Sequence, residues 1–361
     1  MGADAGGQRG GAGPVTPSPQ RQSAALSIPG PVLDQLEANG LRVGAILDEV
    51  ERRLHLQVSS SQAFVDETAR YLMSAGGKRF RPMVVALVAH LGDATRDEIP
   101  DAGVVVELIH LATLYHDDVI DEAVARRGSP SANLRWDNTI AILTGDYLFA
   151  RAAELSADLG VESTRIVART IATLCEGQVR EVQGSRGALP PDVPALEPTL
   201  DHYLRVIADK TASLIAASCR LGTILAGCSE DEVEAATTYG WNVGMAFQLS
   251  DDILDISSEH EDSGKTPGTD LREGVRTLPV LFAVEADPDG ELARLLDQDE
   301  LGDEDVARAL ALLRGSPALD RARQAAADYV ETAVDELELF GDRPVTTALR
   351  RLAEYALDRV G

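Results

Sequence analysis

Apolar residues recur at intervals of three and four from about residue 28 to the end of the chain. This spacing places apolar side chains on one face of an α-helix. Glycine and proline interrupt the pattern, most clearly in two polar breaks at residues 185–198 and 257–274. No stretch alternates apolar and polar residues convincingly, as a half-buried strand would. The pattern therefore predicts a single all-α domain that spans residues 28–361.

Residues 1–27 differ from the rest of the chain because they are rich in glycine, proline, serine and glutamine. A segment with so few large apolar groups cannot bury enough surface to fold, so we predict a disordered tail. It lacks the apolar core of a secretory signal. No uncharged apolar run reaches the roughly 20 residues of a membrane-spanning helix, so we expect no transmembrane segment.

The charge balance narrows the possible partners. The chain has 59 acidic and 33 basic residues, which gives a formal net charge of -26. So acidic a surface repels nucleic acid and anionic lipid, and we expect no nucleic-acid partner. The three cysteines are odd in number and have no CxxC spacing, which disfavours a disulfide framework or a zinc site. They fit a reducing compartment and predict a cytoplasmic location.

An acidic motif occurs twice. "HDDVID" (116–121) returns as "SDDILD" (250–255), each time at the end of a long apolar helical pattern. Residues four apart share a helix face, so each copy gathers carboxylates that repel one another unless a cation neutralises them. One copy could be a solvated helix end, but two copies in apolar helices favour a Mg²⁺ site with oxygen ligands. The carboxylates are those of Asp117, Asp118 and Asp121 in the first copy and Asp251, Asp252 and Asp255 in the second.

Basic side chains lie beside these motifs or at glycine and proline breaks. Each one alone could be an ordinary surface charge, but together they are what a metal-bridged diphosphate requires. His110 lies seven residues before Asp117 on the same helix face, where a lone histidine is more often a core residue. Gln248 shares a face with Asp251 and decides nothing by itself. The basic candidates are Lys78, Arg79, Arg81, Arg126, Arg127, Lys210 and Lys265.

Five motifs together resemble the ordered signature of the trans-isoprenyl diphosphate synthases of the long-chain, polyprenyl type. They are "GGKRFRP" (76–82), "HDDVID" followed by "RRG" (126–128), "DKTASL" (209–214), "FQLSDDILD" (247–255) and "GKTPGTDLREG" (264–274). The resemblance implies the isoprenoid synthase fold, a bundle of about ten or more helices around a deep central cavity. It also implies a homodimer.

The resemblance assigns roles to individual residues. The six aspartates would hold Mg²⁺, with three ions per site, on an allylic diphosphate. Of these, the first three, with Arg126, Lys210 and Lys265, are the expected catalytic groups. Val275 departs from the family, since many relatives have lysine there. The positions that match the allylic diphosphate site are Arg126, Lys210, Gln248 and Lys265, and those that match the isopentenyl diphosphate pocket are Lys78, Arg81, His110 and Arg127. Thr211, which follows Lys210, is a further expected substrate-binding residue.

The implied reaction is electrophilic alkylation, in which the allylic C–O bond ionises and isopentenyl diphosphate attacks the resulting cation. The family places aromatic residues at the positions of Ala112 and Thr113 when products are short. Both residues are small here, so we expect an open channel and a C35–C50 product for quinone side chains. Leu148 and Phe149 are candidates for its floor, or ordinary core residues.

Four other functions compete with this interpretation. A short-chain synthase would make geranylgeranyl or farnesyl diphosphate. A class I terpene cyclase would lack "GGKRFRP" and the second "SDDILD" motif. A phosphohydrolase could use the His116–Asp117 pair but needs further histidine ligands, and the chain has only six histidines. An inactive partner subunit of a heteromeric synthase would have lost aspartates that are all present here.

Overall fold

The computed structural model describes residues 36–184, 196, 199–258, 267–298 and 301–358. The predicted tail and Lys265 lie outside these ranges, as does most of the first polar break, so the division into a tail and a domain stays a prediction. The all-α prediction is confirmed. The elements are α2 (Val43–Gln57), α3 (Ala63–Ser74), α4 (Phe80–Ala89), α5 (Glu98–Ile120), β1 (Ala125–Arg126), β2 (Ser129–Pro130), α6 (Ala132–Arg135), α7 (Asn138–Asp158), α8 (Val161–Gly184), α9 (Leu200–Ile207), the π-helical turn η1 (Ala208–Ala212), α10 (Ser213–Leu225), α11 (Glu230–Ser257), α12 (Thr269–Arg272), α13 (Leu278–Ala286), α14 (Glu291–Leu296), α15 (Asp303–Arg314), α16 (Ala318–Glu336), the 3₁₀ turn η2 (Leu337–Phe340) and α17 (Pro344–Asp358).

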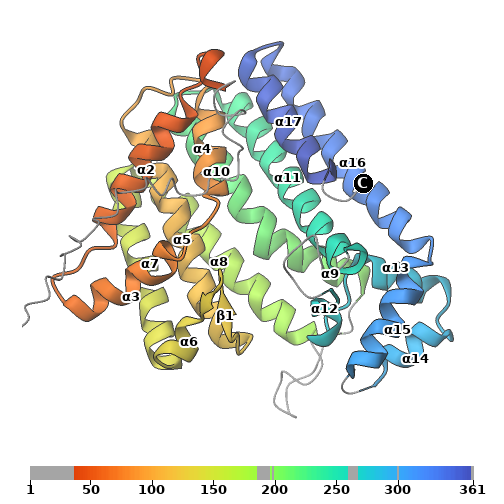
Figure 1. The fold of residues 1–361 in the computed structure, drawn as a ribbon. Helices are drawn as coiled ribbons and strands as arrows, with labels where there is room; N and C mark the ends of the chain where they lie inside the picture. Colours follow the sequence, from red (N-terminus) through yellow and green to blue (C-terminus); the bar gives the residue numbers. More distant parts are fainter. Residues whose placement is uncertain (1–35, 185–195, 197–198, 259–266, 299–300, 359–361) are drawn as a thin grey trace, which may run out of the picture.

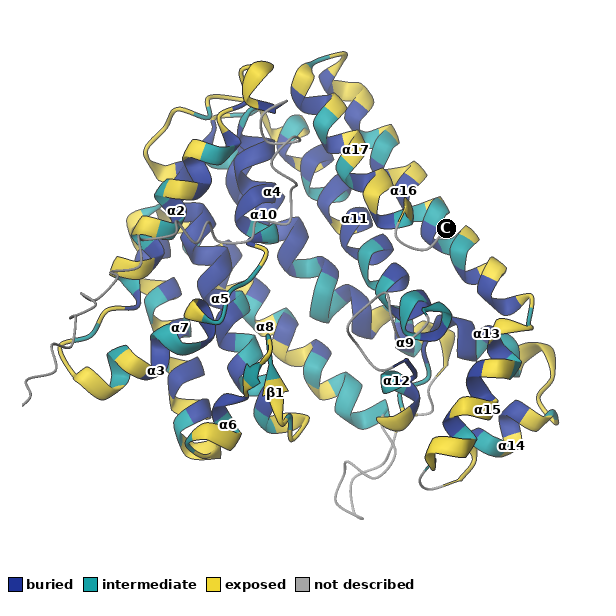
Figure 2. Ribbon diagram, viewed as in Figure 1, coloured by how far each residue is buried: buried dark blue, intermediate teal, exposed yellow. Residues whose placement is uncertain are grey.

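Helices α5, α10 and α11 lie toward the middle of the ribbon, between α2 and α7 on one side and α16 and α17 on the other (Figure 1). Helices α4, α5, α10 and α11 carry mostly buried residues, whereas the outer helices expose one face to solvent (Figure 2). Helix α5 packs against α4 and α7, and α11 packs against α10 and α16. The buried face of α16 is rich in alanine, with Ala322, Ala326 and Ala333, which lets its backbone approach α11 closely.

The two long central helices carry the acidic motifs to the same region. Helix α11 begins with a capping box in which Ser229 and Glu232 each satisfy the other's backbone N–H. It then runs for 28 residues and ends just after the second motif. Helix α5 ends within the first motif, with Asp121 as its C-cap. Both motifs therefore lie at the C-terminal ends of buried helices.

The fold departs from the sequence prediction in two short elements. Strands β1 and β2 form an antiparallel hairpin directly after the first motif. Its two-residue turn is Arg127–Gly128, and both residues have positive φ, 53° and 75°, as a type I′ turn requires. The second element is α12, which lies within the break predicted at residues 257–274. Among the described helices, none is both long and apolar enough to cross a bilayer.

Candidate active site

A cavity of about 310 Å³ opens between the ends of the two motif helices. Its walls come from α5, β1, α8, α9, η1, α11 and α12, and from the chain that follows α12. Three of the six motif carboxylates line it, namely those of Asp117, Asp121 and Asp252. Arg126 and Lys210 line it as well, so both signs of charge face one space. The sequence-based expectation that the two motifs share a cavity agrees with this placement.

Asp117 and Asp121 occupy an electrostatically costly position. Burial raises the pKa of Asp117 to about 6, against the opposing effect of the Lys210 ammonium. Burial also raises the pKa of Asp121. The negative end of the α5 macrodipole lies at the same place and further disfavours negative charge. A cation in the cavity would relieve all of these effects.

Asp252 is fixed by neutral donors. The Tyr203 hydroxyl donates to one carboxylate oxygen, and Gln248 Nε2 donates to the other over 2.8 Å. Thr211 in turn donates to Gln248 Oε1 over 2.9 Å, which orients the amide. Burial raises the pKa of Asp252, and the two donors oppose that rise. Gln248 and Thr211 are both predicted site residues. They orient Asp252, and they also line the cavity.

The other three motif carboxylates do not line the cavity. Asp118 is fully buried and accepts a 2.7 Å hydrogen bond from Arg126 Nε. Its second oxygen has no partner among the described residues. Asp255 accepts from the backbone N–H groups of Thr269 and Asp270, over 3.1 and 3.2 Å, and so holds the start of α12. Asp251, which directly precedes Asp252 in the sequence, is half-buried.

The carboxylates are therefore not assembled into a closed metal site. Within the described part of the chain, no three histidine, cysteine or acidic side chains are grouped closely enough to hold an ion by themselves. The donor set nevertheless fits Mg²⁺, which is typically bound by one or two carboxylates and completed by substrate phosphate. The metal roles of the six aspartates remain predictions.

Lys210 is held next to the first motif by an unusual turn. It lies in the π-helical turn η1, a geometry that is frequent at functional sites. Its ammonium pairs with the Glu181 carboxylate on α8. Burial opposes its charge, but Glu181 and Asp117 prevail and raise the pKa of Lys210. The residue is therefore a fixed cation at the cavity.

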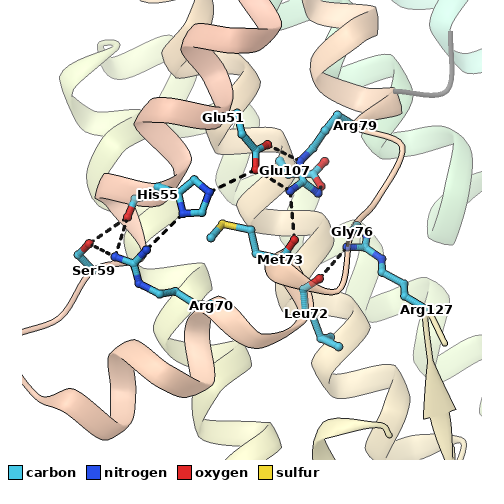
Figure 3. Close-up of polar contacts among 10 residues, drawn as sticks. All are labelled: Glu51, His55, Ser59, Arg70, Leu72, Met73, Gly76, Arg79, Glu107 and Arg127. Carbon is cyan, nitrogen blue, oxygen red and sulfur yellow. Dashed lines mark hydrogen bonds and ion pairs between the residues drawn. The ribbon is translucent and has the colours of Figure 1, made fainter. Parts of the chain in front are cut away.

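The residues predicted to form the second pocket do not line this cavity. Burial lowers the pKa of Arg81 to about 10, and the buried Arg81 Nε has no partner among the described residues. Burial, together with Arg81 and Arg127, depresses the pKa of His110 well below its usual value. Arg127 Nη1 donates to the carbonyls of Leu72 and Gly76 (Figure 3). Lys78, the remaining predicted member, is exposed.

The residues predicted to set product length are differently placed. Ala112 is fully buried, whereas Thr113 keeps partial exposure and donates to the His110 carbonyl over 2.8 Å. Leu148 is fully buried in the core, and Phe149 packs edge-on against the His116 ring. None of these four side chains lines the described cavity. Their role in product length stays a prediction.

Comparison with known proteins decides the family. A family profile described as "Polyprenyl synthetase" matches residues 62–313. A nonaprenyl diphosphate synthase of Mycobacterium tuberculosis is 44% identical over 91% of this chain and 96% of its own length. The chain belongs to the polyprenyl synthetase family. This result confirms the family that the five motifs resemble.

Solved structures of polyprenyl synthetases agree with this fold. A decaprenyl diphosphate synthase from Rhodobacter capsulatus superposes with a TM-score of 0.82 at 37% identity, and covers 91% of this chain and 99% of that one. A polyprenyl synthase from Caulobacter crescentus, complexed with calcium and isoprenyl diphosphate, has a TM-score of 0.79 at 35% identity, with 91% and 97% covered. The isoprenoid synthase architecture is therefore established for this polyprenyl synthetase.

Several cavity residues of this polyprenyl synthetase were not found from the sequence. Glu181, Tyr203 and Arg276 line the cavity but belong to no repeated motif. Arg276 had one signal, since it directly follows Val275, where many relatives have lysine. Both residues line the cavity, so Arg276 places a positive charge beside Val275. Its current partners are the Leu296 carbonyl at 3.3 Å and Asp297 at 3.4 Å, both near the limit for hydrogen bonds.

Replacing Arg276 by methionine should raise the KM for the allylic diphosphate by about 10-fold, because one charge-assisted contact to a phosphate would be lost. The KM for isopentenyl diphosphate should change less than twofold. Steady-state kinetics with each substrate varied in turn measures both constants. The matched control is Arg308→Met, which removes an arginine paired with Glu291 on an exposed surface. Equal allylic KM values in the two variants would show that Arg276 does not contact the substrate.

Proposed function

We propose that this polyprenyl synthetase is a Mg²⁺-dependent prenyltransferase that extends an allylic diphosphate with successive isopentenyl diphosphates. Farnesyl or geranylgeranyl diphosphate is the expected primer, and a C35–C50 all-trans polyprenyl diphosphate, for quinone side chains, is the expected product. One observation supports this most directly: Asp117, Asp121 and Asp252 face a single cavity together with Lys210 and Arg126. The name of the M. tuberculosis relative supports a long-chain product.

The cavity residues fit the ionisation step. Three Mg²⁺ ions, when bound by the motif carboxylates, would neutralise the diphosphate and assist its departure. Lys210 and Arg126 face the same space and stabilise negative charge on the departing oxygen as the C–O bond breaks. Lys265 is expected to do the same but lies outside the described residues. The released diphosphate is the expected acceptor of the proton lost after alkylation.

The second pocket fits isopentenyl diphosphate. Arg81, Arg127 and Lys78 supply positive charge, and Arg81 keeps a buried donor without a partner among the described residues. His110 is held neutral by burial and by the neighbouring arginines. Its ring can therefore donate one hydrogen bond to a phosphate without carrying a charge. Asp117 acts electrostatically on Arg81, and Arg126 acts on His110, so the two groups of residues are close enough for a transfer between two diphosphates.

The alternatives fit less well. His116 Nε2 lies 3.1 Å from the Ile142 carbonyl and 3.4 Å from Asp146, away from the other motif. No described histidine joins it in a metal cluster, which disfavours a phosphohydrolase. An inactive subunit would not need the Asp252 network, and a cyclase would not need the Arg81 pocket. A shorter product remains the principal competitor within the family.

We also propose that the protein is a cytoplasmic homodimer. Ile142 and Leu143 on α7 are 43% and 58% exposed, and Val179 on α8 is 60% exposed. Helices α7 and α8 pack against each other, so these apolar side chains lie on neighbouring elements. Such surfaces commonly mark protein contacts. Sedimentation analysis that gives the mass of one chain would contradict the dimer.

A direct assay tests the activity. The purified protein is incubated with Mg²⁺, farnesyl or geranylgeranyl diphosphate and labelled isopentenyl diphosphate, and the products are sized by chromatography. We expect C35–C50 chains, whereas a C15 or C20 end product would exclude the long-chain assignment. Chelation of divalent metal should reduce turnover at least 100-fold, because the carboxylates would then repel the diphosphate, and added Mg²⁺ should restore it. Full activity after chelation would exclude the metal dependence.

A further inference from the structure

The segment between α3 and α4 is held by a buried arginine. Arg79 is only 4% exposed, although arginine is rarely buried without partners. Its Nε and Nη2 donate to the two oxygens of Glu51 on α2, over 2.8 and 3.1 Å. Its Nη1 donates to Glu107 on α5 over 3.1 Å, and Nη2 also reaches the Met73 carbonyl (Figure 3). One guanidinium thus joins two helices to the segment that connects α3 and α4.

The backbone of this segment is strained where the arginine is attached. Arg79 has φ 47° and ψ 37°, in the left-handed region that residues other than glycine seldom occupy. Such a conformation persists only where the surrounding contacts determine it. Glu107 is 1% exposed, and a buried carboxylate requires a cation partner. The ion pairs therefore neutralise the Glu107 carboxylate and also fix the backbone of Arg79.

A second guanidinium meets the same segment. A Cβ on Gly77 would lie 2.7 Å from Nη1 of Arg79 and 2.7 Å from Nη1 of Arg127. A side chain at this position would displace both groups, and its φ of 147° favours glycine. Arg127 donates to the carbonyl of Gly76 on the same turn. The turn is thus restrained by two guanidinium groups, each anchored to a different part of the fold.

The basic residues of this segment differ in whether they bind other protein groups. Arg79 directs four of its five N–H donors to protein acceptors. Arg81, two residues later, retains its buried Nε without a partner among the described residues, and Lys78 remains exposed. We infer that Glu107 and Glu51 are positioning residues, which act through Arg79 to hold Lys78 and Arg81 against the diphosphate of isopentenyl diphosphate. This inference rests on the proposed function, because that function supplies the ligand.

Two substitutions test the inference by kinetics. Glu107→Gln and Glu51→Gln keep the side-chain shape but remove the charge that orients Arg79. Each should raise the KM for isopentenyl diphosphate by about 10-fold, while kcat and the KM for the allylic diphosphate change less than twofold. The matched control is Glu49→Gln, since Glu49 also lies on α2 and pairs with Arg52 and Arg53 away from the segment. Unchanged KM values in a folded Glu107→Gln variant would overturn the inference.

Hydrogen exchange tests the same inference without relying on turnover. The amides of residues 76–81 should exchange at least 10-fold faster in Glu107→Gln than in wild type, and at the wild-type rate in Glu49→Gln. If Glu107→Gln does not fold, the partly exposed Glu51 permits the same comparison. If the wild-type protein has no prenyltransferase activity but the variants show these exchange rates, the proposed function is refuted, while the restraint of residues 76–81 through Arg79 is supported. If Glu107→Gln or Glu51→Gln weakens the binding of both substrates equally, the substitution has loosened the structure as a whole. That result would overturn the positioning role.

Discussion

Replacing Asp117 by asparagine should lower kcat by about 10³-fold, the scale of losing one preorganised electrostatic contact to a departing oxyanion. Asparagine has the same size but no charge, so the cavity keeps its shape and loses one metal ligand. Burial already raises the pKa of Asp117 to about 6, so a nearby cation would favour its charged form. Kinetics at saturating Mg²⁺ and saturating concentrations of both substrates would measure the loss.

The control for this variant is an aspartate near the cavity that faces solvent. Asp201 lies on α9 next to the cavity residues His202 and Tyr203, but its side chain is exposed and pairs with Arg205. Asp201→Asn should therefore keep wild-type kcat. The melting temperature of Asp117→Asn should equal or exceed that of the wild type, because removing a charge that burial destabilises does not weaken the fold. Wild-type kcat in Asp117→Asn would rule out a metal role for this carboxylate.

Helical periodicity was sufficient to predict most of the fold, because the burial of one helix face leaves a repeated apolar signal. Two short elements gave no such signal. Strands β1 and β2 have two residues each, too few for any alternation to register. The hairpin turn did carry a local cue, since Arg127–Gly128 resembles the polar-residue-then-glycine turn that links short strands. Helix α12 depends on Asp255, 14 residues before its first residue, Thr269, and sequence spacing cannot reveal that contact.

The candidate site was predictable to a similar degree. Spacing of four along a helix predicts that Asp117 and Asp121 share a face, and both residues line the cavity. The same rule paired Asp251 with Asp255 in the second motif, yet Asp252 lines the cavity instead. The reason is tertiary: Tyr203 from α9 binds Asp252, while the start of α12 occupies Asp255. Contacts between elements far apart in the sequence decide which carboxylate of a motif turns inward.

A phenylalanine at position 113 should shorten the products from C35–C50 to C20 or below. Thr113 lies one helical turn before Asp117 and keeps partial exposure, so a larger ring has room to project below the first motif. The growing chain would then meet a wall after few additions. Product sizing by chromatography measures the effect, and Thr113→Val is the matched control, since it keeps the size and replaces the hydroxyl by a methyl group. Unchanged lengths in Thr113→Phe would place the wall elsewhere.

Substitution of Ala112 should affect stability more than substitution of Thr113, because closely packed atoms surround Ala112. Ala112 is 0% exposed, and a Cβ on Gly145 of α7 would lie 3.1 Å from the Ala112 carbonyl oxygen, so the two helices are closely packed there. Ala112→Phe should shorten the products but also lower the unfolding free energy by about 1–3 kcal/mol, the usual cost of overpacking. Thr113→Phe should shorten them with little loss of stability. If Ala112→Phe shortens the products without any change in the melting temperature, then the side chain faces an open channel, and the packing between α5 and α7 does not limit it.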